Sequence, residues 1–383
     1  MGIITPNAKR PAYETAAIEI QHRLCAMNAG DRIPAERQLC KDLGVSRVTL
    51  RKAMEGLHRE GYLETRQGGG TILLKEVAPP TSNTATPTKF LGLVVPSIEH
   101  SFISRIVRGF ESHTSEAEYN MALAHDYGDM DLQISQLKRM LDSGISGIAI
   151  YPDSGNILRP EFLKLIQKLK NSNTPMVMID RYVPSADTTT IMSDNVQGMY
   201  MATEHLILTG HRRIGLLSFG PEGGVTDKDR RKGFLLALKD YNLPPEPNFE
   251  IELGTNGHEE SAQEAITKLL ESSDAHTFDA IACMQDNMAF GAHMAIQSHK
   301  SININGIGLT GYDNLNREIY RANGLNLCSI DQPAEEIGRK AAHALISSIE
   351  RKPETKRAQH ILLKPCLKLR ASSGTSDHPS HTH

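Results

Sequence analysis

Short apolar runs alternate with helical patterns from residue 89 to residue 370, and this alternation limits the fold more than any other feature. One helical pattern places Ile103, Ile106, Val107 and Phe110 on the same face of a helix. Repeated strand–helix units predict parallel sheets that helices cover on both faces. The region is too long for one small sheet, so we expect two doubly wound lobes. The expected strands are Phe90–Val95, Met121–Ala124, Ile145–Tyr151, Met176–Asp180, Ile214–Phe219, Phe249–Leu253, Ala280–Met284, Ile307–Tyr312 and Leu327–Ile330.

Polar residues stand at the carboxyl ends of several expected strands, where sheets of this kind bind ligands. Asp180 and Arg181 end one strand, Gln285 follows another, and Asp313 follows a third. Each has a structural alternative, because Asp180 and Arg181 can form an internal ion pair and Asp313 can cap a turn. The pattern nevertheless favours a polar binding site at these strand ends.

Residues 34–74 follow a different pattern, with two short helical segments separated by Gly44-Val45. The second segment begins after Ser46, a residue type that caps helices well. Two short strand patterns follow, joined by the residues RQGGG at 66–70. A helix-turn-helix with a small hairpin is a winged helix, which places its second helix in the major groove of DNA. The predicted inward face of that helix holds Leu50, Ala53, Met54 and Leu57.

The candidates for DNA contact lie on the opposite face and on the hairpin tip. Arg47 is the candidate for a base edge, since its guanidinium matches guanine O6 and N7. The alternatives are a solvated helix face for the arginines and a plain tight turn for the glycines. No Lys-Ser/Thr follows the glycines, which argues against a nucleotide phosphate loop. The candidates on this face and tip are Arg47, Thr49, Arg51, Gln67, Gly68 and Gly69.

Charge divides the chain in the same way. Residues 1–75 hold 12 Lys+Arg against 8 Asp+Glu, whereas the remainder holds 30 against 37. A basic front on an acidic body fits DNA binding by one module. Residues 76–88 are rich in Pro, Thr and Ser, so we expect a linker between a winged unit at 10–75 and a lobed domain at 89–370. We expect residues 371–383 to be a disordered tail.

The five cysteines are scattered and show no C-x-x-C spacing, which predicts reduced thiols and neither disulfides nor a zinc site. The N-terminus lacks the apolar segment of a signal peptide, and no stretch reaches 18 apolar residues. We therefore expect a cytoplasmic protein without a membrane span. The motifs G-x-S-x-G, H-E-x-x-H and the full Walker pattern are missing from the sequence, so we expect no enzyme and no cofactor.

The winged unit resembles the GntR family of bacterial transcription regulators. The resemblance rests on four motifs in the family's order, namely PAER at 34–37, GVSRVTLRKA at 44–53, L-x-x-x-G-Y-L at 57–63 and QGGGT at 67–71. The resemblance adds Glu36, Arg37 and Ser46 to the implied DNA-binding residues, with Arg37 expected on a phosphate; the alternative for Arg37 is an ordinary surface arginine.

Residues 90–369 resemble the effector domain of the LacI family, which is related to periplasmic sugar-binding proteins. The motifs that support this resemblance are RGFE at 108–111, MIDR at 178–181, SDN-x-x-G at 193–198, EHL-x-x-x-GHRRI at 204–214, DRRKGF at 229–234, QDNMAFGA at 285–292, TGYDN at 310–314 and SIDQP at 329–333. A GntR-type front on a LacI-type body is similar to the arabinose-repressor type of regulator. The resemblance implies two lobes joined by three crossovers, which we expect near Ser193, Tyr312 and Asp331.

The LacI resemblance also implies an effector site. In it, Phe102 packs on the apolar face of a ligand, Asp180 and Asp313 accept hydroxyl hydrogens, and Arg230 donates. Gln285 stands where the family often has Asn, and Asn256 where some members carry an aromatic residue. The full implied set is Phe102, Asp180, Arg181, Arg230, Asn256, Gln285, Asp313 and Gln332.

These observations predict a multidomain α/β protein, with an N-terminal winged helix-turn-helix of α+β class and a two-lobed, doubly wound parallel α/β domain of the periplasmic-binding-protein type. The predicted function is sequence-specific transcription regulation, as a homodimeric repressor on a double-stranded DNA operator under the control of a sugar effector. Two alternatives from other classes are a solute-binding protein of a transporter and an enzyme acting on sugars. Gel shift with genomic DNA tests the first, and a turnover assay tests the second.

Overall fold

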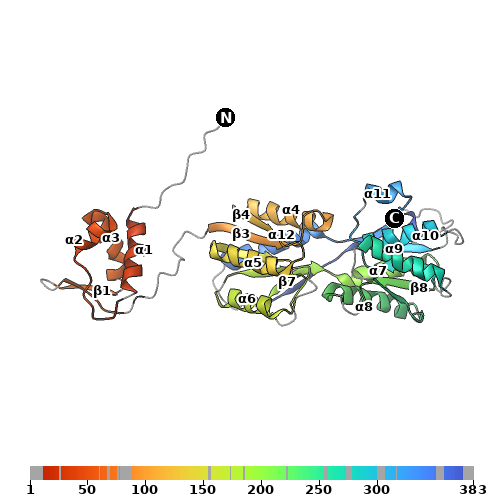
Figure 1. Cartoon of the computed structure of the whole chain (residues 1–383), viewed down its shortest axis with the longest axis horizontal. Helices are drawn as coiled ribbons and strands as arrows, with labels where there is room; N and C mark the ends of the chain where they lie inside the picture. Colours follow the sequence, from red (N-terminus) through yellow and green to blue (C-terminus); the bar gives the residue numbers. More distant parts are fainter. Residues whose placement is uncertain are drawn as a thin grey trace, which may run out of the picture. The chain divides into compact units, whose positions relative to one another are not determined.

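The computed structural model divides the chain into two compact units, residues 1–87 and 88–383 (Figure 1). It describes residues 12–25, 27–59, 61–66, 70–75, 77, 88–153, 157–172, 174–183, 186–220, 223–253, 258–272, 278–299, 307–315, 317–350 and 358–373. The expected linker therefore lies outside the described residues except for Val77 and Thr88.

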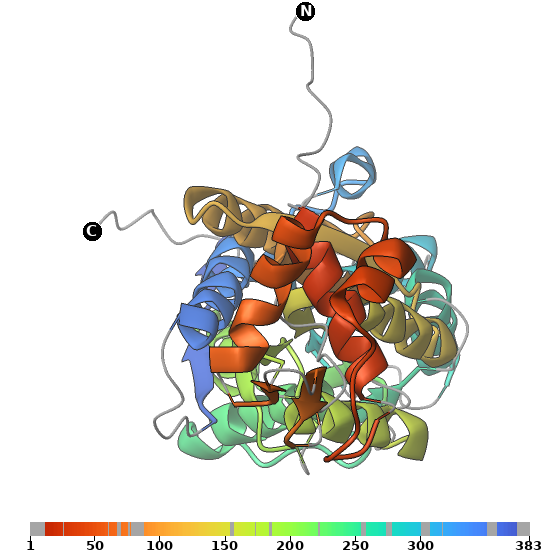
Figure 2. The same ribbon diagram turned by 90° about the vertical axis from the view of Figure 1, so that its left-hand side faces the viewer.

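The first unit is a winged helix, as its sequence predicts. Three helices pack on one another beside a two-stranded hairpin (Figures 1 and 2). The strands pair antiparallel, with Leu63 opposite Leu73. The elements are α1 (Ala12–Leu24), α2 (Glu36–Leu43), α3 (Arg47–Arg59), β1 (Leu63–Arg66) and β2 (Gly70–Leu73).

Local chemistry explains the turn between α2 and α3. Gly44 ends α2 in the left-handed conformation, at φ 64°, which glycine adopts without strain. Ser46 then accepts a hydrogen bond from the Thr49 backbone N–H at 3.1 Å and so caps the start of α3. The predicted inward face of α3 is buried, with Leu50 fully enclosed.

The second unit holds two lobes, each built on a six-stranded sheet. The sheet of lobe 1 has the order β13-β7-β6-β5-β3-β4, and all its pairs are parallel. Its strands are β3 (Thr88–Val95), β4 (Asn120–His125), β5 (Ile145–Ile150), β6 (Met176–Ile179), β7 (Thr189–Ser193) and β13 (His360–Leu363). Its helices are α4 (Ser101–Glu116), α5 (Met130–Asp142), α6 (Pro160–Asn171) and α12 (Ala334–Glu350).

The sheet of lobe 2 has the order β14-β12-β11-β10-β8-β9, and only β14 runs antiparallel to its neighbour among these paired strands. Its strands are β8 (Ile214–Ser218), β9 (Glu250–Glu252), β10 (Ala280–Cys283), β11 (Gly308–Tyr312), β12 (Cys328–Asp331) and β14 (Cys366–Lys368). Its helices are α7 (Asn195–Leu208), α8 (Val225–Asp240), α9 (His258–Glu271), α10 (Asp286–Ser298) and α11 (Glu318–Ala322).

Alternate residues of β3 explain why helices cover both faces of its sheet. Leu91 and Leu93 belong to the core cluster under α4 and α12, whereas Val94 belongs to the cluster under α5 and α6. Side chains of a strand point alternately to opposite faces, so a continuous apolar run is buried on both sides. Lobe 2 has its own large core around Phe234 and Tyr312.

The chain passes between the lobes after Ser193, after Asp331, and between β13 and β14 at residues 364–365. The prediction of a crossover near Tyr312 is wrong. β11 ends at Tyr312, but the chain returns through α11 to β12, which pairs parallel with β11 in the same sheet. The third passage runs between the short edge strands β13 and β14, in which exposed and half-buried residues alternate.

The predicted tail is also partly wrong, because Ala371–Ser373 form a short 3-10 turn on lobe 2. Ser372 Oγ donates to Leu309 O at 2.8 Å and accepts from Cys328 N at 2.7 Å. These buried backbone groups need partners, which is why the turn is ordered. Residues 374–383 lie outside the described residues. Within the described part of the chain, every helix is too short or too polar to cross a bilayer.

Candidate functional site

The outward face of α3 presents the predicted DNA-contacting side chains. Arg47 is exposed and makes no hydrogen bond or ion pair with another described residue. Thr49 is half-buried, and its hydroxyl lies 2.8 Å from Ser46 Oγ, so both hydroxyls are committed to the helix cap. Val48 is 79% exposed on the same face. The pattern analysis missed Val48, although an exposed methyl group on such a helix can contact a thymine methyl.

Arg51 and Glu36 differ from the prediction in one respect, because they bind each other. Arg51 Nε donates to Glu36 Oε1 at 3.1 Å, and Nη2 donates to Glu36 Oε2 at 3.2 Å. This ion pair joins α3 to α2, so Arg51 must break it before it contacts DNA. Arg37 is exposed on α2. Gln67, Gly68 and Gly69 lie outside the described residues.

Asp180 is the central residue of the second candidate site, at the end of β6 in lobe 1. Its backbone is left-handed, at φ 62°, and its side chain is buried. Tyr151, which follows β5, donates its hydroxyl to Asp180 Oδ2 at 2.7 Å. Burial raises the pKa of Asp180, and the positive charge of Arg181 and the hydrogen bond from Tyr151 oppose that rise.

Lobe 2 contributes a buried arginine, Arg230, to this site. Its Nε donates to Asn195 Oδ1 at 2.8 Å, and its Nη1 donates to Met284 O at 2.6 Å. The guanidinium carbon lies 3.7 Å from the ring centroid of Tyr312, a cation–π contact. Its Nη2 lies 3.9 Å from Asp313 Oδ1. Arg230 is therefore held rigidly with one edge toward Asp313.

Asp313 lies where lobe 2 meets the crossover and lobe 1. Gln332, in the Asp331–Ala334 crossover, donates from Nε2 to Asp313 Oδ1 at 2.7 Å. His100, which precedes α4 in lobe 1, has its Nε2 4.0 Å from Asp313 Oδ2, beyond hydrogen-bond distance. Arg105 of α4 donates to Asp331 Oδ1 at 2.8 Å, a second contact between the lobes.

We name one set of six residues the interlobe cluster. Its two carboxylates balance its two guanidinium groups. Buried polar atoms almost always have partners, so unpartnered ones in such a place favour a ligand site. Among the enclosed atoms that lack a partner within the described residues, three belong to this set and one to His100 beside it, and they are Asp180 Oδ1, Arg181 Nε, Gln332 Oε1 and His100 Nδ1. The interlobe cluster consists of Tyr151, Asp180, Arg181, Arg230, Asp313 and Gln332.

Three predicted effector residues lie elsewhere or cannot be placed. Phe102 is 3% exposed and packs in the core of lobe 1, so its position does not support contact with a ligand. Gln285 is half-buried before α10, with its Oε1 2.5 Å from Nδ1 of His258. Asn256 lies outside the described residues. Pattern analysis also missed Tyr151, His100 and His258, because no local signal marks them.

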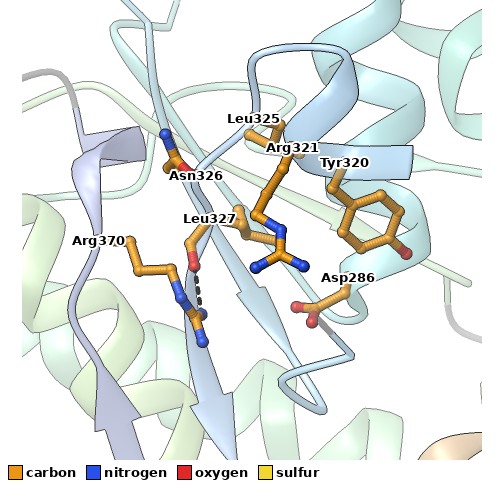
Figure 3. A pocket seen from close by; sticks show the side chains of 7 residues that line it. All are labelled: Asp286, Tyr320, Arg321, Leu325, Asn326, Leu327 and Arg370. Atoms are coloured by element: carbon orange, nitrogen blue, oxygen red, sulfur yellow. Dashed lines mark hydrogen bonds between the residues drawn. The ribbon is translucent and has the colours of Figure 1, made fainter. Parts of the chain in front are cut away.

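Lobe 2 contains a separate small cavity of about 10 Å³, the space of one water molecule (Figure 3). Asp286 lines it, accepting from Ser329 Oγ at 2.6 Å and from Leu315 N at 2.7 Å. Burial raises the pKa of Asp286 to about 7. Arg370, on the other side of the cavity, donates to Leu327 O at 2.7 Å. The cavity is too small for a sugar.

No group of three His, Cys, Asp or Glu side chains among the described residues could hold a metal ion.

Two family models match the chain in the order of its two units. Residues 12–73 match the gntR family of bacterial regulatory proteins. Residues 88–367 match the periplasmic binding proteins and sugar binding domain of the LacI family.

Curated relatives and solved structures agree with these matches. The arabinose metabolism transcriptional repressor of Geobacillus stearothermophilus is 28% identical over 347 residues, covering 91% of this chain and 93% of that protein. The HTH-type transcriptional repressor PurR of Aliivibrio salmonicida is 30% identical over 272 residues, covering 70% and 78%. The transcriptional regulator CelR in complex with cellobiose has a similar fold, with a TM-score of 0.63 at 22% identity over 89% of this chain and 100% of that one.

These matches confirm the two-part fold class, and they do not favour the solute-binding or enzymatic alternatives. The chain therefore belongs to the LacI family through its two-lobed domain and carries a gntR-family DNA-binding unit in front of it, which makes it a transcriptional regulator and not an enzyme.

Proposed function

We propose that this regulator is a cytoplasmic repressor that binds a palindromic operator as a homodimer and responds to a small, neutral, polyhydroxylated sugar bound at the interlobe cluster. The observation that carries the proposal is the set of enclosed, unpartnered polar atoms from lobe 1 and the crossover residue Gln332, beside the buried Arg230 and Asp313 of lobe 2. Two winged units related by a two-fold axis match two half-sites of an operator.

The chemistry of the interlobe cluster favours a neutral ligand. Each sugar hydroxyl donates one hydrogen bond and can accept others, so different hydroxyls of one sugar can donate to Asp180 Oδ1 and to Gln332 Oε1 and accept from Arg181 Nε. An anionic ligand would add a negative charge beside Asp180 and Asp313, and an uncompensated buried charge is costly. Sugar phosphates are therefore expected to bind weakly. The name of the arabinose metabolism relatives makes L-arabinose the first sugar to test.

The enclosure of the cluster suggests how sugar binding changes DNA binding. Asp180 and Arg230 are buried, so a ligand enters only when the lobes separate and stays only when they close. The closed lobes fix one geometry of the dimer, and sugar binding shifts the population of dimers toward that geometry. A differential affinity of ~2–3 kcal/mol changes operator occupancy ~30- to 150-fold.

Two measurements on the full chain test this proposal. Calorimetry with L-arabinose, further neutral pentoses and hexoses, and their phosphates should find stoichiometric binding of a neutral sugar only. Fluorescence anisotropy with DNA from upstream of the regulator's own gene should then find an affinity that this sugar changes. Preference for sugar phosphates, or operator binding that no bound sugar alters, would contradict the proposal.

A further inference from the structure

Residues 30–33 pair with β2 at the edge of the β1–β2 hairpin as a short extended segment, through an isolated antiparallel bridge. Gly30 N donates to Leu73 O at 2.7 Å, Leu73 N to Asp31 O at 3.0 Å, and Ile33 N to Thr71 O at 3.0 Å. Arg32 stands opposite Ile72 in this antiparallel pairing. The segment is short, and no periodic pattern in the sequence predicts it.

Alternation along this segment decides where Arg32 points. Ile33 is buried in the core of the winged unit, so the side chain of Arg32 projects to the opposite, solvent side. Arg32 is exposed, and its guanidinium makes no ion pair or hydrogen bond with another described residue. The side chain of Asp31 projects to the other side of the segment, where its Oδ2 accepts from Asn28 N at 2.8 Å.

The guanidinium of Arg32 lies against Gly70, the first residue of β2. A Cβ atom on Gly70 would lie 2.5 Å from Arg32 Nε and 2.7 Å from Nη2, closer than real contacts allow. Gly70 also has a φ of 80°, a conformation that favours glycine. The last glycine of the QGGG motif therefore gives both the turn and the space in which Arg32 rests.

We propose that Arg32 is a DNA-phosphate contact of the wing, held in place by Gly70. The proposal rests on DNA binding by the winged unit and adds a residue that neither the family motifs nor α3 supplies. A guanidinium suits this role, because its fork of donors matches phosphate oxygens bidentately. Its contact with Gly70 reduces the rotamer freedom that binding would otherwise cost.

The test measures how the full chain binds a random-sequence 30-base-pair duplex at several salt concentrations, by fluorescence anisotropy. Arg32→Ala should weaken binding about 10-fold at low salt and reduce the slope of log K against log salt by about 1. Arg32→Lys should keep the wild-type slope and bind with intermediate affinity, since lysine retains the charge without the fork. Lys168→Ala, an exposed cation of α6 in the second unit, is the matched control and should change neither quantity.

Each other result overturns the proposal. An unchanged affinity and slope in Arg32→Ala would exclude the phosphate contact. A slope lost equally in Arg32→Lys would assign Arg32 a structural role in the wing. Failure of the unaltered chain to bind the duplex at low salt would instead remove the DNA binding on which the proposal rests. Circular dichroism of each variant, with an unchanged melting temperature, establishes that the winged unit is folded.

Discussion

Tyr151 donates a 2.7 Å hydrogen bond to one carboxylate oxygen of Asp180 and leaves the other oxygen enclosed without a partner among the described residues. The two residues follow neighbouring parallel strands, β5 and β6, so their proximity is a property of the sheet. The bond orients the carboxylate, and the remaining oxygen is free to accept a hydrogen from a ligand. This relationship makes Asp180 the first residue to vary.

Asp180→Asn should weaken sugar binding about 10- to 100-fold, because an amide is a poorer acceptor than a carboxylate for a hydroxyl hydrogen. Operator binding without sugar should stay within about twofold of the parent. Calorimetry with the sugar identified by screening measures the first quantity, and anisotropy measures the second. Asp187→Asn, an exposed carboxylate before β7, is the control. Equal sugar affinity in parent and Asp180→Asn would remove Asp180 from the site.

Arg47→Ala should reduce operator affinity by about 1–3 kcal/mol, because a bidentate contact with a base edge carries energy of that size. Arg51→Ala should cost less, since Arg51 already has Glu36 as a partner and must give up that ion pair on binding. Anisotropy at one fixed salt concentration compares the two variants. A larger loss in Arg51→Ala than in Arg47→Ala would contradict this ranking, and changed sugar binding in either would point to a misfolded chain.

The stability of lobe 2 should depend on the protonation of Asp286. Burial raises the pKa of Asp286 to about 7 in the folded chain, above the ordinary aspartate value of 3.8. Between these values the folded state binds more protons than the unfolded state, so the free energy of unfolding falls as pH rises from about 4 to 7. Above pH 7 the effect is complete and no longer changes.

Asp286→Asn tests this pH dependence. The amide is nearly isosteric and can keep contacts with Ser329 and Leu315, but it cannot titrate. Urea unfolding at pH 5 and pH 8 should give a smaller loss of unfolding free energy in the variant than in the parent, by at least ~1 kcal/mol. The same pH dependence in both proteins would exclude Asp286 as its source.

Two glycine-to-alanine changes should have opposite effects on stability. A Cβ on Gly109 of α4 would lie 1.9 Å from Glu335 O of α12, so Gly109→Ala must push two packed helices apart and should cost ~3 kcal/mol or more. A Cβ on Gly56 of α3 meets nothing within 4 Å. Gly56→Ala should therefore raise stability by about 0.5–1 kcal/mol through helix propensity. Urea unfolding measures the change in unfolding free energy of each variant. Changes of the same sign in the two variants would contradict the packing argument.

Much of the fold can be predicted from local pattern. The turn of Gly44 and the cap of Ser46 define the start of α3, and its buried face follows from apolar residues at helical spacing. The long apolar strands are predicted because burial on both faces requires a continuous run, as in β3. Strands β7, β13 and β14 were not predicted in this way, because β7 begins with two threonines and β13 and β14 are short edge strands with partly exposed residues.

The sequence by itself determined the helix-turn-helix, the long apolar strands, the two-part organisation and the polar residues at strand ends, because these depend on residues close together in the chain. Only the tertiary structure decided that Tyr312 does not lead to a crossover, that Phe102 lies in the core, and that Tyr151 and His100 join Asp180 and Asp313. Those facts depend on the pairing of strands and helices far apart in sequence. Local periodicity carries no information about such pairing, so the partners of each buried charge emerge only when the lobes are assembled.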